Sequence, residues 1–407
     1  MKPLEEAQQE VFAAFAPVGR GRRALLAALD HFAAEPVVAQ AAAPPFDQSA
    51  MDGYALRADD TKGASPDAPV TLPVRGESRA GGPPPPPLSP ATAMRIYTGA
   101  VVPEAADAVQ LQEQVRASAQ TIELTEPVAP HANIRRRATD TRPGTQLLAT
   151  GDRIGSGEIA LLASQDIASV TVFQKPRVAI LATGDELRDI GEPDQPGRIV
   201  NSNGYALAAQ VLEAGAEPWV LPIARDLRGD VADALRTGLR ADVLLISGGV
   251  SVGDYDVVRA ALAEVGVTLA FWKVNIKPGK PLAFGTFGAV PVLGLPGNPV
   301  STWLSFELFA RPGLRKMLGD PLPFRTRASV TMTRSIARRP GRTEIIRVRL
   351  SRRGGELLAE PLTQQGSGSL PSLARVDALA LVPAEQATVG QGDRLEALVL
   401  RSGGAPA

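Results

Sequence analysis

The stretch that decides the fold reads Val243-Leu244-Leu245-Ile246-Ser247-Gly248-Gly249-Val250-Ser251-Val252-Gly253-Asp254-Tyr255-Asp256. Its first four residues are apolar and predict a buried strand over Val243–Ile246, and the glycines that follow predict a tight turn. A helix over Asp256–Val265 and another strand over Thr268–Trp272 are expected next. A buried strand that passes through a turn into a helix is typical of a parallel sheet with helices packed on it.

The same alternation of strands and helices continues on both sides of this stretch. We expect strands over Arg177–Ala182 and Trp219–Ile223, and helices over Tyr205–Glu213, Gly229–Leu239 and Val300–Met317. Asn203 precedes the first of these helices and could cap it. The pattern predicts a three-layer α/β/α domain whose mostly parallel sheet is covered on both faces.

Unusual segments follow the end of each predicted strand. They are Thr183-Gly184-Asp185-Glu186, then Asp226, then the Gly248-Gly249 turn, and finally a group of lysines at positions 273, 277 and 280. Ligands of open α/β sheets bind at the carboxyl ends of the strands. These segments are therefore expected to form one binding site.

The lysines are concentrated in one place. The chain has only seven lysines against thirty-six arginines, yet Lys273, Lys277 and Lys280 fall within eight residues, around the turn Lys277-Pro278-Gly279-Lys280-Pro281. An ammonium group is a compact point charge that suits an oxyanion held between backbone N–H groups. We expect a site for phosphate or another tetrahedral oxyanion, and the alternative is an ordinary turn with solvated lysines.

Four acidic residues form a second candidate group. Asp52, Glu186, Asp226 and Asp256 each lie in a loop near glycine or at a strand end. Hard cations such as Mg²⁺ take oxygen ligands and commonly bridge carboxylates to phosphates. Each residue alone could equally be a solvated loop charge, so the hypothesis requires that the fold bring Asp52 close to the others.

Composition excludes several classes of function. Lysine plus arginine and aspartate plus glutamate number 43 each, so no overall field favours nucleic acid or an anionic membrane. No apolar run is long enough to span a membrane, and Met1–Ala16 lacks the core of a signal peptide, so a cytoplasmic location is expected. The absence of cysteine removes disulfides and thiolate chemistry, and His31 and His131 are too few for a histidine metal site.

The remaining segments read as different kinds of structure. We expect helices over Pro3–Phe15 and the alanine-rich Arg22–Ala34, a turn-rich loop over Pro45–Tyr54, and a helix over Ser156–Ser164. Short strands are predicted over Val70–Val74, Ala93–Tyr97, Ala108–Gln112 and Thr121–Leu124. Arg325–Ala407 is expected to be a separate domain of short β-strands.

Seven motifs in order carry a resemblance to a known family. They are Pro45–Ala55, Thr98-Gly99-Ala100, Asn133–Arg137, Thr183–Leu187, the double-glycine turn, Lys277–Pro281 and Leu295-Pro296-Gly297-Asn298-Pro299. The chain resembles the molybdopterin molybdenumtransferases, a family that includes the C-terminal enzymatic domain of gephyrin. The resemblance spans the chain.

The resemblance implies four domains and a dimer. The domains would be a discontinuous elongated domain (1–43 and 141–176), an inserted β domain (44–140), an α/β molybdopterin-binding domain (177–322) and a C-terminal β barrel (323–407). It also implies a homodimer whose active site lies between the α/β domain of one subunit and the inserted domain of the other. Asp52 and Thr98 would then reach the sheet of the partner.

The resemblance further implies a reaction and a set of site residues. Adenylylated molybdopterin binds with Mg²⁺, molybdate enters, AMP is released and molybdenum stays on the dithiolene sulfurs of the substrate. The residues implied for catalysis are Asp52, Thr98, Glu186, Asp226, Asp256 and Lys273, of which Glu186, Asp226 and Asp256 would hold the metal. Those implied for molybdate are Lys277, Lys280, Ser301, Arg347 and Ser367. Those implied for the rest of the substrate are Gly248, Gly249, Ser251, Pro296, Gly297 and Pro299.

The sequence departs from the family pattern at three places. Gln48 replaces the usual Asn, and His131-Ala132 replaces the usual Gly-Glu. The turn Gly253-Asp254-Tyr255-Asp256 differs from the commoner Gly-Glu-Ala-Asp, which leaves either Asp254 or Asp256 as a candidate metal ligand. None of these changes removes a lysine or a main acidic residue.

Two other functions are open on the sequence alone. The double-glycine turn also occurs in molybdopterin adenylyltransferases, with which the protein could also make contact. The inserted domain, the lysine turn and the C-terminal β domain favour molybdenum insertion. A non-catalytic scaffold of the same fold is the second alternative, because the related domain of gephyrin also binds receptor peptides.

Overall fold

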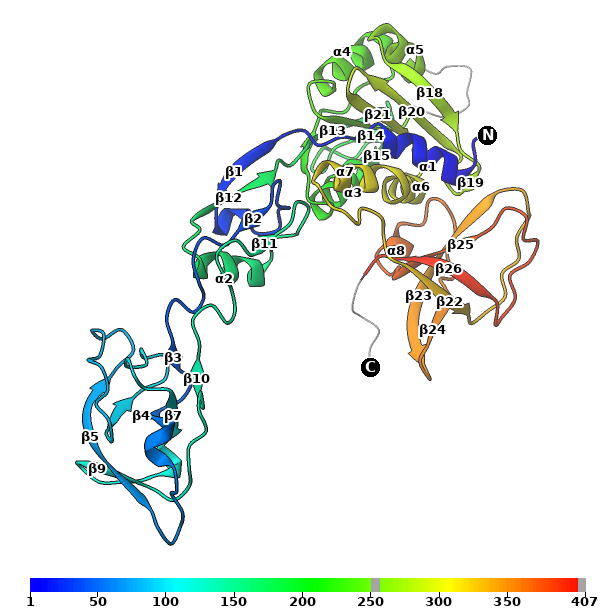
Figure 1. The fold of residues 1–407 in the computed structure, drawn as a ribbon. Coiled ribbons are helices and arrows are strands. Elements are labelled where there is room, and N and C mark those ends of the chain that lie inside the picture. The colour runs from blue at the N-terminus through cyan, green and yellow to red at the C-terminus, as the bar shows by residue number, and fades with distance from the viewer. Residues whose placement is uncertain (250–256, 402–407) are drawn as a thin grey trace.

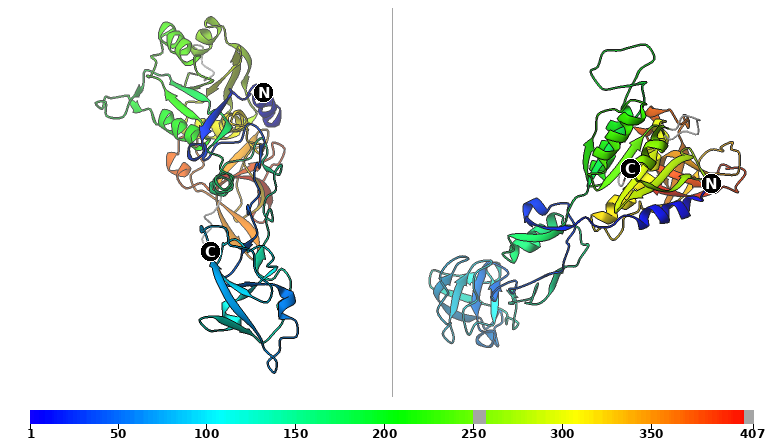
Figure 2. Two further views of the ribbon diagram at one scale, coloured as in Figure 1. Left: turned by 60° about the vertical axis from the view of Figure 1, so that its left-hand side comes forward. Right: turned by 90° about the horizontal axis from the view of Figure 1, so that it is seen from above.

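The computed structural model describes residues 1–249 and 257–401 and has an elongated shape (Figure 1). Three candidate residues, Ser251, Asp254 and Asp256, lie outside the described residues. An α/β domain forms one end of the molecule, a β barrel lies beside it, and a second β domain forms the far end (Figures 1 and 2). The prediction of a multidomain α/β and β protein is confirmed.

The α/β domain is built on a six-stranded sheet. Its strands, in spatial order, are β16 (Glu217–Val220), β13 (Arg177–Ala182), β17 (Val243–Ser247), β21 (Val290–Leu295), β20 (Pro281–Phe287) and β18 (Thr268–Lys273). Strands β16, β13, β17 and β21 pair in parallel. Strand β20 pairs antiparallel with both β21 and β18, so β18 runs in the same direction as the parallel strands. The expected mostly parallel sheet is confirmed, with β20 as its single reversed strand.

Helices cover both faces of this sheet. One face carries α1 (Leu4–Ala13), α3 (Ser202–Glu213) and a continuous helix made of α6 (Pro299–Ser305), a π-helical segment (Phe306–Ala310) and α7 (Arg311–Met317). The other face carries α4 (Arg228–Gly238) and α5 (Val257–Glu264) (Figure 1). Alternate residues of β13 enter the two cores, because successive side chains of a strand point to opposite faces.

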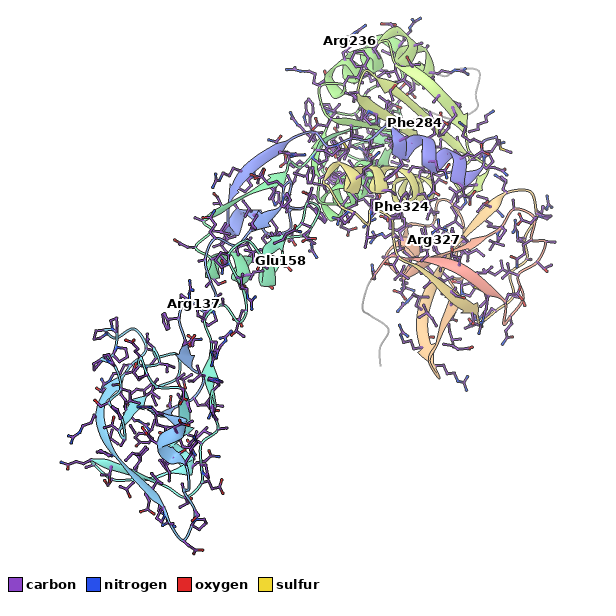
Figure 3. The ribbon with its side chains drawn as sticks, viewed as in Figure 1. Arg137, Glu158, Arg236, Phe284, Phe324 and Arg327 are labelled. Atoms are coloured by element: carbon purple, nitrogen blue, oxygen red, sulfur yellow. The ribbon has the colours of Figure 1, made fainter. Side chains whose placement is uncertain are left out.

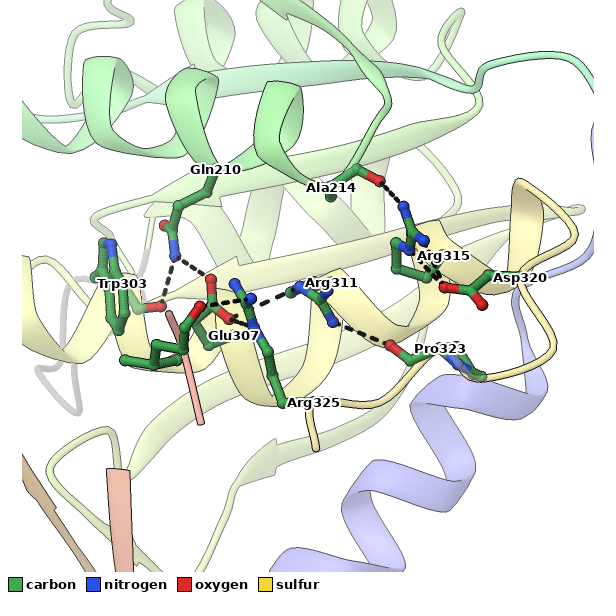
Figure 4. Close-up of polar contacts among 10 residues, drawn as sticks. Gln210, Ala214, Trp303, Glu307, Arg311, Arg315, Asp320, Pro323 and Arg325 are labelled. Atoms are coloured by element: carbon green, nitrogen blue, oxygen red, sulfur yellow. Dashed lines mark hydrogen bonds and ion pairs between the residues drawn. The ribbon is translucent and has the colours of Figure 1, made fainter. Parts of the chain in front are cut away.

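A buried polar network stabilises the helical face that carries α3 (Figure 4). Glu307, in the π-helical segment, accepts a hydrogen bond from Gln210 Nε2 of α3 at 3.1 Å and pairs with Arg325 Nε at 3.0 Å. Arg311 Nε lies 4.0 Å from the same carboxylate, and burial lowers the pKa of Arg311 to about 10. The network ties α3 to the helix beneath it and to the segment that leads into the barrel.

The elongated connection consists of short strands and one helix. Strand β1 (Arg20–Ala24) pairs antiparallel with β12 (Ser169–Phe173) and is followed by a 3₁₀ turn over Leu26–Ala28. The predicted helix over Arg22–Ala34 is therefore wrong, because pairing with a strand almost 150 residues away outweighs the helix propensity of alanine. The other elements are β2 (Val37–Val38), β11 (Gln146–Leu148) and α2 (Ser156–Ser164), the last as predicted.

The inserted β domain forms the far end of the molecule. Its sheet contains β7 (Ala108–Leu111), β4 (Gly53–Leu56), β6 (Ala93–Ile96), β5 (Val70–Ser78), β9 (Thr121–Leu124) and β8 (Arg116–Ala117). Four of these strands were predicted, whereas β4 and β8 were not; β4 begins within the predicted turn-rich loop, and β8 has only two residues. The strands β3 (Gln48–Ser49) and β10 (Ile134–Arg135) connect the domain to the rest of the chain, and Arg137 lies at that connection (Figure 3).

The C-terminal domain is a closed barrel. Its strands are β23 (Thr343–Arg353), β24 (Glu356–Pro361), β22 (Arg327–Met332), β26 (Arg394–Val399) and β25 (Ala378–Val382), and pairing of β23 with β25 closes the ring. The short strand β19 (Ile276–Lys277), from the α/β domain, adds to β23 in parallel. A short helix, α8 (Leu370–Leu373), contacts α6. The lysine turn is thus attached directly to the barrel.

Candidate active site

A cavity of about 450 Å³ lies at the carboxyl ends of β13, β17 and β21. Two short parallel strands, β14 (Leu187–Arg188) and β15 (Ile199–Val200), and the start of α3 close its side. Six predicted residues line the cavity: Glu186, Gly248, Gly249, Pro296, Gly297 and Pro299. The structure brings these strand-end segments together around one cavity, and their role in binding stays a prediction.

The double-glycine turn has a conformation that only glycine adopts without strain. Gly248 and Gly249 have φ angles of 96° and 65°. A β-carbon at Gly248 would lie 2.6 Å from the carbonyl oxygen of Thr183, and one at Gly249 would lie 2.2 Å from Val258 Cγ2. The turn can therefore pack against β13 and α5 while its backbone lines the cavity.

Asn203 has a different role from the one predicted. The N-cap of α3 is Asn201, whose side-chain oxygen accepts a hydrogen bond from the N–H of Gly204 at 3.0 Å. Asn203 Nδ2 instead donates to Ser247 Oγ at 3.0 Å and to the Gly297 carbonyl at 2.8 Å. One amide therefore joins the loops that follow β17 and β21.

Sequence reasoning missed several polar residues of the cavity. Thr183, Asn201, Ser202, Ser247 and Asn298 all line it; three of them lie inside segments quoted above without being named as site residues, whereas Asn201 and Ser202 lie in none of those segments. The hydroxyl of Thr183 is buried and has no hydrogen-bond partner among the described residues. For Thr183, Ser247 and Asn298 the signal was their place within those glycine-containing segments, and no quoted motif marked Asn201 and Ser202.

Two of the predicted acidic residues lie near each other beside the sheet. Glu186 lines the cavity, and the N–H of Asp226 donates to Asp185 Oδ1 at 3.3 Å. Partial burial, together with the negative charges of Asp185 and Glu186, raises the pKa of Asp226. The described residues contain no group of three or more acidic or histidine side chains placed to hold a metal ion, and Asp256 lies outside them.

The three lysines have different surroundings. Lys273 ends β18, and Lys280 precedes Pro281, which lines the cavity. Lys277 Nζ forms an ion pair with Glu344 Oε1 of the barrel at 2.8 Å. Within residues 1–249 and 257–401, the ammonium of Lys280 has no hydrogen bond or ion pair.

Arg347 is buried without a carboxylate partner. It lies on β23, is fully shielded from solvent, and donates from Nη2 to the carbonyls of Gln364 at 3.0 Å and Gly366 at 3.2 Å. Its Nε and Nη1 have no partner in the described part of the chain, and burial lowers its pKa to about 10. Unpaired N–H groups on a buried guanidinium are costly and are typical of a site that receives an anion.

The lysine turn, α6 and the barrel loop meet at one junction. The N–H of Val300 donates to the Ser367 carbonyl at 3.0 Å, and Ser301 is buried beside it on α6. A β-carbon at Gly279 would lie 3.3 Å from Ser305 Oγ, a buried hydroxyl that has no partner among the described residues. The segments that carry the predicted molybdate residues therefore touch one another. Lys277 differs from the other residues of this group because its ammonium is paired with Glu344.

Asp52 and Thr98 form a separate pair in the inserted domain. The backbone N–H and the hydroxyl of Thr98 each donate to Asp52 Oδ1 at 2.8 Å, and these two bonds lower the pKa of Asp52. Asp52 directly precedes β4 and Thr98 follows β6, so the pair lies in the domain at the far end of the molecule, away from the α/β sheet (Figures 1 and 2). A single chain does not bring Asp52 to Glu186.

Three family models together match most of the chain. They are described as the MoeA N-terminal region (domain I and II), at residues 2–165, a probable molybdopterin binding domain, at 179–316, and the MoeA C-terminal region (domain IV), at 329–400. A molybdopterin molybdenumtransferase 2 of Mycobacterium tuberculosis is 37% identical over 366 residues, which cover 88% of this chain and 90% of the relative. This chain belongs to the molybdopterin molybdenumtransferase family.

Other members of the molybdopterin molybdenumtransferase family agree in length and fold. The Bacillus subtilis enzyme is 35% identical over 383 residues, covering 93% of this chain and 89% of that one. A crystal structure of a MoeA protein from Pyrococcus horikoshii aligns with a TM-score of 0.84 at 29% identity and covers 98% of this chain and all of that one.

No helix among the described residues is long and apolar enough to cross a membrane.

Proposed function

We propose that this protein transfers molybdenum from molybdate to adenylylated molybdopterin and releases AMP. As a member of the molybdopterin molybdenumtransferase family, the chain is a transferase of molybdenum cofactor biosynthesis. The proposal adds the two substrates and the residues that bind them.

The observation that carries the proposal is the buried guanidinium of Arg347, which has no carboxylate partner among the described residues. Two of its nitrogens lack partners within residues 1–249 and 257–401, and it lies beside the Gly366-Ser367 loop that is bonded to the start of α6. Ser305 contributes another buried hydroxyl, next to the lysine turn, that has no partner in the described part of the chain. Donors without acceptors fit a tetrahedral oxyanion, and we assign molybdate to this junction with Lys277, Lys280, Ser301, Arg347 and Ser367 as its residues.

The neighbouring strand-end cavity suits the organic substrate. Its glycine turns expose backbone, and Thr183, Ser247 and Asn298 supply neutral hydrogen-bonding groups. Pro281 lines this cavity directly after Lys280, so molybdate at the junction would be close to a substrate held in the cavity. The positive charge of Lys280 and Lys273 would offset the charge of the phosphoanhydride as it is cleaved.

Glu186 and Asp226 would hold Mg²⁺, together with Asp256 and oxygens of the substrate. Partial burial, followed by the negative charges of Asp185 and Glu186, raises the pKa of Asp226, and a bound cation would offset those charges. When bound, Mg²⁺ supplies positive charge at the phosphoanhydride. The protein's part is to supply the carboxylates.

We propose a homodimer in which Asp52 and Thr98 of one protomer complete the site of the other. The distance between the inserted domain and the sheet within one chain supports this arrangement (Figure 2). We keep the four-domain division given above as a proposal, supported by the separate sheets and cores of the inserted domain and the barrel, although α1 packs in the core of the α/β domain. A cytoplasmic location and a contact with molybdopterin adenylyltransferase stay predictions.

An activity assay separates this function from its alternatives. Purified protein is incubated with adenylylated molybdopterin and Mg²⁺, with molybdate, with tungstate, or with neither. AMP release and protein-bound molybdenum that depend on molybdate are expected. Adenylylation of molybdopterin from ATP would instead identify an adenylyltransferase, and the absence of both reactions would favour a scaffold.

Lys280→Ala tests the assignment of the anion site. We expect molybdate binding to weaken by about 1.5–3 kcal/mol, the scale of one charge-assisted hydrogen bond. Isothermal titration with molybdate measures the change, and Lys62→Ala, an exposed lysine of the inserted domain, is the matched control. An unchanged dissociation constant in Lys280→Ala would remove this lysine from the site.

A further inference from the structure

Glu344 holds the lysine that the anion site needs. Lys277 and Glu344 are register partners in the parallel pair β19–β23, and their charged atoms lie 2.8 Å apart. The side chain of Glu344 is only 14% exposed, whereas that of Lys277 is 47% exposed. The carboxylate is therefore fixed in the barrel, and the lysine is the partner that is free to move.

A second cation keeps Glu344 in place. Arg338 Nε lies 3.5 Å from Glu344 Oε2, and the Arg338 side chain is itself held by the carbonyls of Pro383 and Arg342, at 2.6 and 2.8 Å. The Arg338 side chain has no exposed surface. If the ammonium of Lys277 moved away, the positive charge of Arg338 would therefore still compensate the charge of Glu344.

Glu344 and Arg347 lie on opposite faces of β23. They are three positions apart, and successive side chains of a strand alternate between faces. Ile346 belongs to the barrel core, on the same face as Glu344, whereas Ile345 packs against the α/β core, on the same face as Arg347. The pair with Glu344 therefore draws the ammonium of Lys277 to the face away from Arg347.

We propose that Glu344 is a specificity-determining residue that competes with the oxyanion for Lys277. In the free protein Glu344 forms an ion pair with Lys277. A tetrahedral oxyanion that binds at Arg347 must draw the ammonium of Lys277 away from Glu344, from one face of β23 to the other. The exchange breaks one ion pair and forms another, with no covalent change. Competition from Glu344 lowers the affinity of the site for every anion. Dianions lose least, because they attract Lys277 more strongly than a single carboxylate does, so the site selects for them. This inference rests on the proposed function, because it assumes that the oxyanion site uses Lys277.

A double-mutant cycle tests the competition. Molybdate is titrated into the full-length protein, Glu344→Gln, Lys277→Ala and the double variant, and the dissociation constants are compared. Glu344→Gln is expected to tighten binding about two- to fivefold, the range for a partly exposed ion pair, and to have no effect when Lys277 is already alanine. Glu344→Asp keeps the charge beside Arg338 but shortens the reach to Lys277, so it should also tighten binding.

Two controls make each outcome decisive. Glu360→Gln removes a carboxylate from another barrel pair, with Arg334 at 2.8 Å, and should leave binding unchanged. Unchanged or weaker binding in both Glu344 variants, or an effect that persists without Lys277, would overturn the competition while Lys280→Ala still weakens binding. If Lys280→Ala and Lys277→Ala both bind like the wild type, the proposed anion site is wrong and this inference fails with it.

Discussion

The strand-end cavity and the Asp52–Thr98 pair differ in how much of the chain builds them. The cavity takes residues from the ends of β13, β17 and β21 and from the start of α3, held together by Asn203. The pair is a local arrangement of two neighbouring loops at the opposite end of the molecule (Figure 1). A cavity of this kind can bind substrate within one chain, whereas the pair can contribute only if a second protomer presents a cavity to it.

Subunit mixing gives the largest expected effect and tests this difference directly. Asp52→Ala and Lys280→Ala should each lower AMP release about a hundredfold or more, because each removes a charged group from the proposed reacting centre. After subunit exchange, activity should recover to about a quarter of the wild-type value, since half the dimers are mixed and each has one intact site. No recovery, with exchange verified by differently tagged chains, would mean that the pair does not complete a partner's site.

Glu307→Ala tests how far the stability of the α/β domain, which carries the cavity, depends on its buried polar network. Loss of the carboxylate leaves Arg311 and Arg325 buried without their partner, which should cost about 3–5 kcal/mol in the free energy of unfolding of the α/β domain. Denaturant unfolding followed by tryptophan fluorescence measures it, because Trp303 lies beside the network. The exposed pair variant Glu360→Gln should change stability by less than about 1 kcal/mol, and an equally small loss in Glu307→Ala would contradict the prediction.

Asn203→Ala tests whether one amide positions the two loops of the cavity. It removes two hydrogen bonds, and we expect KM for adenylylated molybdopterin to rise about five- to thirtyfold, the equivalent of about 1–2 kcal/mol. Asn203→Asp should be impaired as well, because a carboxylate cannot donate to the Gly297 carbonyl. Glu213→Gln, at the other end of α3, serves as the control. A wild-type KM in both Asn203 variants would assign these bonds no role in binding.

Thr98→Val gives the smallest effect and concerns the pair alone. The variant removes the hydroxyl donor and keeps the backbone donor, which is the larger of the two causes of the lowered pKa of Asp52. The pKa of Asp52 should therefore rise only part of the way toward its ordinary value. As the pH is lowered, the variant's Asp52 should take up its proton at a higher pH than the wild-type residue does. An NMR titration of the carboxyl carbon measures the shift. A further decrease of the pKa would contradict the hydrogen-bond explanation.

The sequence predicted the α/β domain well because its signals are local. The apolar runs of β13 and β17, the glycines at 248 and 249, and the spacing of helical residues each determine an element from its own composition. Prediction failed where distant parts of the chain decide. Arg22–Ala34 reads as a helix but begins as a strand paired with β12, and β4 is a strand because β6 and β7 lie on either side of it.

The sequence by itself determined which residues are available for chemistry: lysines gathered in one turn, acidic residues at strand ends, glycines where backbone must approach closely, and no cysteine. Only the tertiary structure decided which of these groups have partners. Among the described residues it left Arg347 with unpaired N–H groups, paired Lys277 with Glu344, and joined Asn203 to the end of β17 and the loop after β21 instead of making it a helix cap. The physical reason is that hydrogen bonds and ion pairs depend on distances of a few ångströms between segments far apart in the chain, and no local pattern of residues encodes those distances.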